Sequence, residues 1–166
     1  MEKIIQLPIN QADIDKLNIG DFVYLEGILY TARDASHSKM VELLNNNKPL
    51  PFEIKGQSIY YMGPSPTPTH LPCGSAGPTT SSRMDVYTPR LLEEGLRVMI
   101  GKGDRSQLVA DSIKKNHAVY FGTIGGAGAY LGQCIKKMEC IAFDELGAEA
   151  VYKLHIEKFP AIVLLK

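Results

Sequence analysis

The sequence predicts an α/β protein whose sheet is substantially parallel. Short apolar segments rich in β-branched and aromatic residues alternate along the chain with segments whose apolar residues have helical spacing. The chain has 166 residues, 45% of them apolar, which suffices for one hydrophobic core without disulfides or a structural metal. We therefore expect a single domain, residues 1–166, in which helices connect buried strands.

The N-terminal part contains the clearest strand of the sequence. Residues 4–9 predict a short strand, and residues 10–17 predict a capped helical turn. The segment 22–32 is apolar on both faces, which is typical of a strand covered on both sides rather than of an edge strand. A helix capped by Asp34 is expected to end at the segment 45–51, which is rich in asparagine and proline.

The middle of the chain is divided by a segment rich in proline and glycine. A short strand at residues 58–62 leads into residues 63–78, which we call the proline loop and expect to be irregular. A helix at 89–94 and a strand at 97–101 should follow.

The C-terminal part repeats the alternation. A helix should begin at Asp104 or Ser106 and be followed by a strand at 118–122. Further strands are expected at residues 134–143, 154–156 and 161–165.

Charge and cysteine content exclude several classes of protein. Eighteen basic residues balance eighteen acidic residues, so no broad field attracts nucleic acid or an anionic membrane. We see no signal peptide and no apolar run of membrane-spanning length, and we expect a soluble cytoplasmic protein. Cys73, Cys134 and Cys140 lack CxxC spacing and should be free thiols, so we assign this chain no metal ligand and no cofactor-binding residue.

The segment GPTTSSRMD, residues 77–85, predicts a helix start that binds an anion. Pro78 suits the first turn of a helix, and the hydroxyl side chains of residues 79–82 follow where backbone N–H groups lack helical partners. Arg83 would then lie one turn after Thr79 on the same face, so that a hydroxyl and a guanidinium meet one small anion. The alternative is a capped helix with a solvated arginine.

The segment TARDASH, residues 31–37, places charged residues where a buried strand gives way to a helix. Ligands of α/β proteins gather at the carboxyl ends of strands, so Arg33 is a candidate ligand-binding residue. His37 follows one helical turn later and is a candidate proton relay or a partner of Asp34. The alternative is a surface ion pair between Arg33 and Asp34.

The segment IGKGDRS, residues 100–106, also follows a strand directly. Lys102 lies between two glycines, and the low steric cover there suits contact with a bound anion. The alternative is an ordinary turn with a solvated lysine.

The segment GTIGGAGAYLG, residues 122–132, matches the glycine-rich dinucleotide fingerprint poorly. Gly126, Gly128 and Gly132 have the spacing GxGxxxG, and too little chain follows for the remaining strands of a Rossmann unit. We expect these glycines to allow close backbone approach to a neighbouring segment or to a ligand.

Taken together, GPTTSSRMD, TARDASH, IGKGDRS and GTIGG resemble, in content and order, the C-terminal region of class I iron–sulfur-dependent fumarate hydratases and the beta subunits of two-chain fumarases and L-tartrate dehydratases. The resemblance covers nearly the whole chain. It implies a swivelling β/β/α domain with flanking helices, which closes over a 4Fe-4S cluster held by three cysteines of a partner alpha subunit. This chain would bind no cluster alone and would be active only with that alpha subunit. A homo- or hetero-oligomer is expected.

The same resemblance implies roles for individual residues. Arg33, Arg83 and Lys102 would bind the carboxylates of malate or fumarate, and Thr79 would be the base for the C3 proton. An alkoxide on Thr79 needs stabilisation, which we assign to Arg83 and to the positive environment of the cluster. With His37 as a proton relay, the candidate catalytic residues are Thr79, Arg83 and His37.

The resemblance includes enzymes that act on two different substrates, and only local sequence differences distinguish them. KGDRS and GTIGG look more like the fumarase versions, which favours reversible hydration of fumarate to (S)-malate, a reaction of the tricarboxylic acid cycle, over dehydration of L-tartrate. A non-catalytic dicarboxylate-binding module and a nicotinamide-binding domain are the other functions considered. A chain that seals a cluster site should expose a patch of apolar and basic surface.

Overall fold

The computed structural model describes residues 2–123 and 127–166. No described helix is long and apolar enough to cross a membrane. Two short elements, η1 and η2, are 3-10 helices. In chain order the elements are β1 (Ile4–Leu7), α1 (Gln11–Lys16), β2 (Phe22–Thr31), α2 (Asp34–Asn45), β3 (Ser58–Tyr60), η1 (Ser81–Met84), α3 (Thr88–Glu93), β4 (Val98–Gly101), α4 (Gln107–Lys115), β5 (Val119–Gly122), α5 (Gly128–Gln133), β6 (Ile135–Ala142), η2 (Asp144–Glu149) and β7 (Val151–Leu165).

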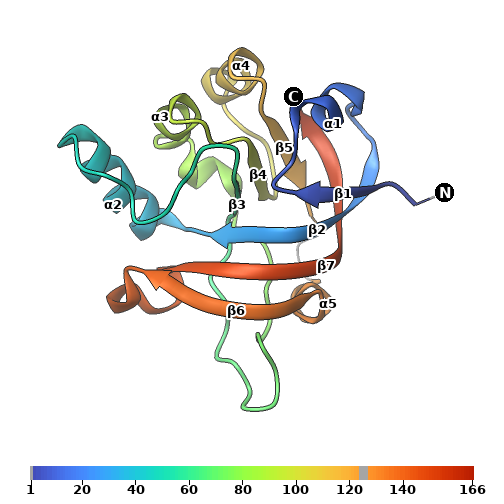
Figure 1. The fold of residues 1–166 in the computed structure, drawn as a ribbon, viewed down its shortest axis with the longest axis vertical. Helices are drawn as coiled ribbons and strands as arrows, with labels where there is room; N and C mark the ends of the chain where they lie inside the picture. The colour runs from blue at the N-terminus through green and yellow to red at the C-terminus, as the bar shows by residue number, and fades with distance from the viewer. Residues whose placement is uncertain (1, 124–126) are drawn as a thin grey trace.

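Four parallel strands and one long antiparallel strand build a closed ring, and a fifth parallel strand, β1, pairs with its first member. β1, β2, β3, β4 and β5 pair in that order, each parallel to its neighbour. β7 runs antiparallel to both β5 and β2, so β2, β3, β4, β5 and β7 close on themselves. β6 pairs with β7, and Figure 1 shows β2, β7 and β6 side by side.

The expected α/β class and mixed sheet are confirmed, but the closed ring was not expected. The segments 154–156 and 161–165, predicted as separate strands, belong to β7, which is 15 residues long. This length lets one strand pair with β6 and β2 along most of its course and with β5 near its end. The segment 22–32 is an internal strand, as its apolar faces predicted.

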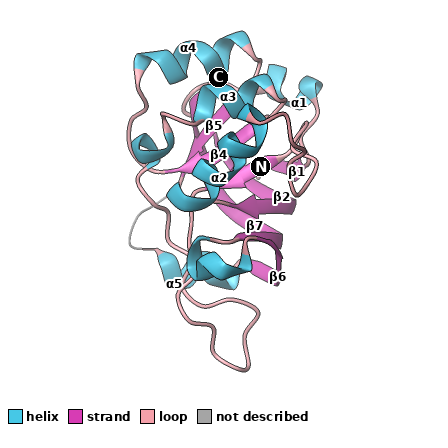
Figure 2. Ribbon diagram, turned by 90° about the vertical axis from the view of Figure 1, so that its left-hand side faces the viewer, coloured by secondary structure: helices cyan, strands magenta, loops and turns pink. Residues whose placement is uncertain are grey.

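Alternating side chains of the central strands enter two cores. In β4, Val98 and Ile100 belong to the core shared by the ring strands, whereas Met99 packs with the core under the helices. Tyr120 of β5 is also on the helix side. Figure 2 shows α2, α3 and α4 together in front of the strands. β3, β4 and β5 are thus buried on both faces, which explains their nearly continuous apolar sequence.

Two helices are capped at their N-termini by the side chains that the sequence predicted. The Asn10 side chain accepts the backbone N–H of Asp13 (2.8 Å) at the start of α1. The Ser106 hydroxyl accepts the N–H three residues on (3.2 Å) at the start of α4. Each bond satisfies a backbone donor that the first helical turn leaves free.

The proline loop contains neither helix nor strand, as predicted. It projects from the sheet on the side of α5 (Figure 1). Its returning arm is bound to α5, where the N–H of Ala76 donates to the carbonyl of Gly128 (2.9 Å).

Two glycines of α5 let the proline loop approach the helix closely. A side chain on Gly128 would collide with Ser75 Oγ, and one on Gly132 would collide with the carbonyl of Gly74. The expected close approach is therefore confirmed for Gly128 and Gly132. Gly126 lies outside the described residues.

Candidate functional site

Four strands end at one edge of the sheet, and the predicted site residues follow them. β2, β3, β4 and β5 are parallel, so their carboxyl ends lie at the same edge. Arg33 follows β2, the proline loop follows β3 and Lys102 follows β4. The segment 77–85 returns to this edge, because Thr80 pairs with Lys102 as an isolated parallel bridge. The fold thus gathers three motifs that are far apart in the sequence.

The Arg33 side chain lies over the start of the proline loop. A side chain added at Gly63 would lie 3.0 Å from Arg33 Cδ and 3.2 Å from its Nη1. Arg33 Nε is buried and has no hydrogen-bond partner among the described residues. A buried donor without an acceptor costs about 1–3 kcal/mol. A carboxylate bound at Arg33 would supply the missing acceptor.

Arg83 is paired with Asp34. Its Nε and Nη2 lie 3.1 and 3.0 Å from the same oxygen, Asp34 Oδ2. The considered surface pair between Arg33 and Asp34 is therefore wrong, because Asp34 reaches Arg83 instead. A guanidinium has five N–H donors, so Arg83 keeps others for a ligand. Its side chain is 51% exposed, and a ligand can reach it.

Thr79 precedes the helical turn rather than beginning it. The 3-10 helix η1 starts at Ser81, and the residue before it is not helical. The backbone N–H of Thr79 donates to the carbonyl of Tyr61 (2.7 Å). That of Ser81 donates to the carbonyl of Lys102 (2.9 Å). The predicted helix with Thr79 and Arg83 on one face is wrong, because the sheet edge binds the N–H groups that this helix was expected to present.

Lys102 lies between this edge and an apolar groove. The groove has a volume of about 280 Å³, and Lys102 is part of its lining. Four large hydrophobic side chains that are exposed to solvent also line it: Phe22, Tyr130, Ile162 and Leu164. We call this surface the Lys102 groove. It joins a cation to an unusually apolar piece of surface.

His37 lies behind the site, in the protein interior. Its Nδ1 lies 2.8 Å from the carbonyl of Arg33, so Nδ1 carries the proton and donates it to that bond. The ring packs against Tyr61 and Tyr87, with centroids 5.4 and 5.9 Å away. Burial lowers the pKa of His37 to about 4. The expected contact with Asp34 is replaced by the bond to Arg33, and a catalytic role stays a prediction.

A buried ion pair behind the site was missed by sequence reasoning. Arg105 Nε donates to Asp85 Oδ1 at 2.7 Å, and the Arg105 side chain is fully buried. Asp85 is the last residue of GPTTSSRMD, and Arg105 lies within IGKGDRS. The available signal was that GPTTSSRMD contains an acidic residue, Asp85, and IGKGDRS contains a second basic residue, Arg105. Local sequence patterns do not reveal that the two charges meet, because that contact depends on the tertiary fold.

The cysteines of this chain do not form a site for an iron–sulfur cluster. All three are free, as expected, with Cys73 and Cys134 buried and Cys140 exposed. Burial raises the pKa of Cys73 to about 11. In residues 2–123 and 127–166 no group of three or more His, Cys, Asp or Glu side chains is suited to hold a metal. A 4Fe-4S cluster therefore does not fit the described residues.

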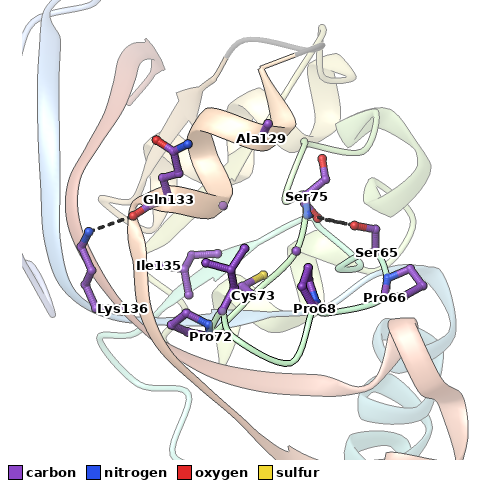
Figure 3. Close-up of a pocket in the computed structure, with 13 residues that line it drawn as sticks. Ser65, Pro66, Pro68, Pro72, Cys73, Ser75, Ala129, Gln133, Ile135 and Lys136 are labelled. Carbon is purple, nitrogen blue, oxygen red and sulfur yellow. Dashed lines mark hydrogen bonds between the residues drawn. The ribbon is translucent and has the colours of Figure 1, made fainter.

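A larger cavity under the proline loop is separate from these residues. It has a volume of about 580 Å³ and lies between the loop, α5 and the start of β6 (Figure 3). Its polar groups bond to one another: Ser65 Oγ accepts the N–H of Ser75 (2.9 Å), and Lys136 Nζ donates to the carbonyl of Gln133 (2.9 Å). The predicted site residues do not line this cavity. The candidate site is the strand edge.

Sequence comparison identifies relatives for nearly the whole chain. The chain is 43% identical over 156 residues to the anaerobic class I fumarate hydratase of Escherichia coli, an alignment that covers 93% of this chain and 28% of that enzyme. It is 44% identical over 149 residues to fumarate hydratase 2 of Leishmania major, covering 89% of this chain and 26% of that enzyme. The putative L(+)-tartrate dehydratase subunit beta of Methanocaldococcus jannaschii is 35% identical over 161 residues, which are 94% of this chain and 83% of that subunit.

The share of each relative's length that the chain covers differs among these proteins. It spans little more than a quarter of the two fumarate hydratases but most of the separate beta subunit. The family model described as Fumarase C-terminus matches residues 2–166. The expected resemblance is confirmed, and the chain belongs to the Fumarase C-terminus family.

Proposed function

We propose that this chain is the beta-type part of a hydro-lyase that reversibly hydrates fumarate to (S)-malate. The observation that carries the proposal is the gathering of Arg33, Arg83 and Lys102 at the strand edge that also holds Thr79. The ion pair with Asp34 places Arg83 beside the residue that follows Arg33. The bridge between Thr80 and Lys102 places Lys102 beside the segment that contains Thr79. A small dicarboxylate matches three cations at such an edge, because each carboxylate accepts charge-assisted hydrogen bonds.

In the proposed reaction the cations orient the substrate. Arg33 contributes its unpartnered Nε, and Arg83 contributes the donors that Asp34 leaves free. Lys102 supplies a point charge from the neighbouring turn. Fixing both carboxylates places the C3 hydrogen of malate in one orientation toward the residue that removes it.

Thr79 is the proposed base for the C3 proton of malate. Its backbone is bound to the sheet through the carbonyl of Tyr61, so Thr79, a half-buried residue, is carried on a rigid segment. A threonine alkoxide forms only where positive charge stabilises it. Arg83, four residues on, and the other cations of the edge are the proposed source of that charge.

The cluster that the reaction needs is proposed to belong to a partner polypeptide. A 4Fe-4S cluster with one open iron acts as a Lewis acid toward the substrate hydroxyl. The fumarate hydratases that match this chain are about four times as long as the matched part, and the tartrate dehydratase relative is named as a subunit. The Lys102 groove supports docking of such a partner beside the site, since apolar surface of this kind is normally covered.

Fumarate is favoured over L-tartrate as the substrate. The relatives named fumarate hydratase are 43% and 44% identical to this chain, whereas the one named tartrate dehydratase subunit is 35% identical. A non-catalytic dicarboxylate-binding module is the second candidate, because the cations of the edge would bind a dicarboxylate without any cluster.

Anaerobic purification of the tagged chain from its own cells tests the proposal. The expected result is a co-purifying larger subunit with cluster cysteines, and a complex that hydrates fumarate faster than it dehydrates L-tartrate. A chain that purifies alone and binds fumarate without turnover supports the binding module instead. NAD should not raise the melting temperature.

The docking surface is tested by two matched variants. Phe22→Ser changes an exposed residue of the Lys102 groove, and Leu108→Ser changes an exposed residue of α4 that lies outside the groove. Phe22→Ser is expected to weaken binding of the larger subunit by at least tenfold, with Leu108→Ser within twofold of wild type. Equal affinities for all three forms would place the interface elsewhere.

A further inference from the structure

Behind the strand edge lies a buried group of polar side chains that the proposed reaction does not use. Arg105 is its centre, and we call the set the Arg105 cluster: Tyr61, Ser81, Asp85, Thr88, Arg105 and Tyr120. Arg105 Nη2 donates to Tyr61 Oη (3.1 Å) and to Thr88 Oγ1 (3.0 Å), while Nε donates to Asp85. The guanidinium also lies over the rings of Tyr61 and Tyr120, at 5.2 and 4.8 Å from their centroids.

The charge of Arg105 is retained although the side chain is buried. Burial alone would disfavour the charged form, but the contacts with Tyr61 and Asp85 outweigh it and raise the pKa of Arg105. The cluster needs a guanidinium because the N–H groups of this planar cation point in fixed, different directions and can bind several partners at once. Few side chains can hold a carboxylate, a phenol and a hydroxyl at the same time.

One side of the Arg105 cluster holds the segment that carries Thr79. The phenol of Tyr61 is bound to Arg105, and the carbonyl of Tyr61 accepts the N–H of Thr79 (2.7 Å). At the other end of the same segment, Asp85 is bound to Arg105. Thr79 and Arg83 therefore lie on a piece of chain that is tied to Arg105 at both ends.

The other side of the Arg105 cluster holds the turn that carries Lys102. The N–H of Ser81 donates to the carbonyl of Lys102 (2.9 Å). The Tyr120 hydroxyl lies 2.8 Å from both the Gly103 carbonyl and Ser81 Oγ. Because a carbonyl can only accept, Tyr120 donates to Gly103, and the Ser81 hydroxyl donates to Tyr120. The turn is therefore bound, through the carbonyls of Lys102 and Gly103, to residues that pack around Arg105.

We propose that Arg105 is a positioning residue, which sets where Thr79 and Lys102 stand relative to each other without touching the substrate. The inference rests on the proposed function for the roles of Thr79 and Lys102, whereas the mechanical coupling is a property of the chain itself. The coupling is therefore tested first by a measurement that needs neither substrate nor turnover.

The variant Arg105→Lys keeps a positive charge on a side chain long enough to contact Asp85, but it lacks the planar guanidinium group. Hydrogen exchange is measured by mass spectrometry on the full chain in its native assembly. Peptides over residues 79–85 and 101–106 are expected to exchange at least tenfold faster in the variant. A peptide over 20–26, whose Gly20 and Tyr24 amides are bound on another side of the sheet, should be unchanged.

Arg90→Lys is the matched control, because Arg90 forms an i,i+4 surface pair with Glu94. It should leave all three peptides as in wild type. Unchanged exchange at 79–85 and 101–106 in Arg105→Lys overturns the proposal. So does equal acceleration of all three peptides, since that indicates a general loss of stability.

Kinetics of the assembled enzyme then separate positioning from binding. Arg105→Lys is expected to lower kcat by at least tenfold and to change KM less than threefold, because the cations remain while the geometry of the proton transfer is lost. A rise of KM alone contradicts positioning of Thr79. If wild type hydrates no dicarboxylate, the proposed function fails, and the exchange result still decides the coupling.

Discussion

Two arginine–aspartate pairs link the same short segment to different parts of the molecule, and their surroundings are opposite. Arg83 pairs with Asp34 at the strand edge, where the side chains are 51% and 35% exposed. Asp85, two residues on, pairs with Arg105 in the interior, where the exposed fractions are 12% and 0%. The chemistry of the contact is the same, but only the outer pair can exchange its partner for a ligand.

The difference shows how one segment can serve both rigidity and binding. An exposed ion pair is worth little, because water competes for both charges. A buried pair is costly to break, because removing one partner leaves an uncompensated charge in the interior. The backbone of segment 79–85 is thus held in place, whereas the exposed Arg83 side chain within it can exchange its partner.

The inner pair should give the largest effect on stability. Asp85→Ala leaves the buried Arg105 charge without its carboxylate and is expected to lower the free energy of unfolding by about 3–5 kcal/mol. Urea denaturation followed by circular dichroism measures the change. A loss below about 1 kcal/mol would make the inner pair no different from a surface pair.

The buried His37 should make the stability of the protein depend on pH. Burial lowers the pKa of His37 to about 4 from an ordinary value of 6.5. Between these pH values the unfolded chain binds a proton that the folded chain does not, so the free energy of unfolding falls as the pH falls from 6.5 toward 4. The shift corresponds to on the order of 3 kcal/mol.

Denaturation at pH 7 and pH 4.5 checks this dependence in two variants. His37→Gln is expected to remove most of the loss between the two pH values. His155→Gln, at an exposed position of β7, should keep it. The same loss in wild type and His37→Gln would mean that other groups cause the pH dependence.

The outer arginine should affect activity more than stability. Arg83→Lys in the assembled enzyme is expected to lower kcat/KM by about tenfold to a few hundredfold, the value of one charge-assisted contact of about 1.5–3 kcal/mol. Its melting temperature should stay close to that of wild type. Steady-state assays with fumarate give the first quantity, and activity within twofold of wild type would remove Arg83 from the site.

The outer pair should give the smallest effect on stability. Asp34→Ala breaks the contact with Arg83 and is expected to change the free energy of unfolding by less than about 1 kcal/mol. Urea denaturation beside Asp85→Ala makes the comparison direct. Equal losses in the two variants would contradict the contrast between the inner and outer pairs.

The sequence predicted the elements well where the signal was local. The Asn10 and Ser106 caps, the buried strand at 22–32 and the irregular proline loop all follow from neighbouring residues. Closure of the ring was not predictable in this way, because it depends on pairing between β2 and β7, which are far apart in the sequence.

The place of the candidate residues in the fold was predicted more accurately than their local geometry. Arg33 and Lys102 lie at the strand edge because parallel strands end together, a rule that needs only the order of elements. Thr79 was expected in a helix, since proline and hydroxyl residues favour a helix start. The sheet edge overrides that preference by binding the N–H groups of Thr79 and Ser81.

Pairing of β2 with β7 also governs how the chain folds. The contact joins the first and last parts of the chain, so a long loop must close before the ring exists. Proteins dominated by such distant pairings fold slowly. Until β7 arrives, β2 and β5 each present an unpaired strand edge, which is a template for pairing with another chain. During synthesis these edges stay open until β7 leaves the ribosome, and aggregation competes with folding over that interval.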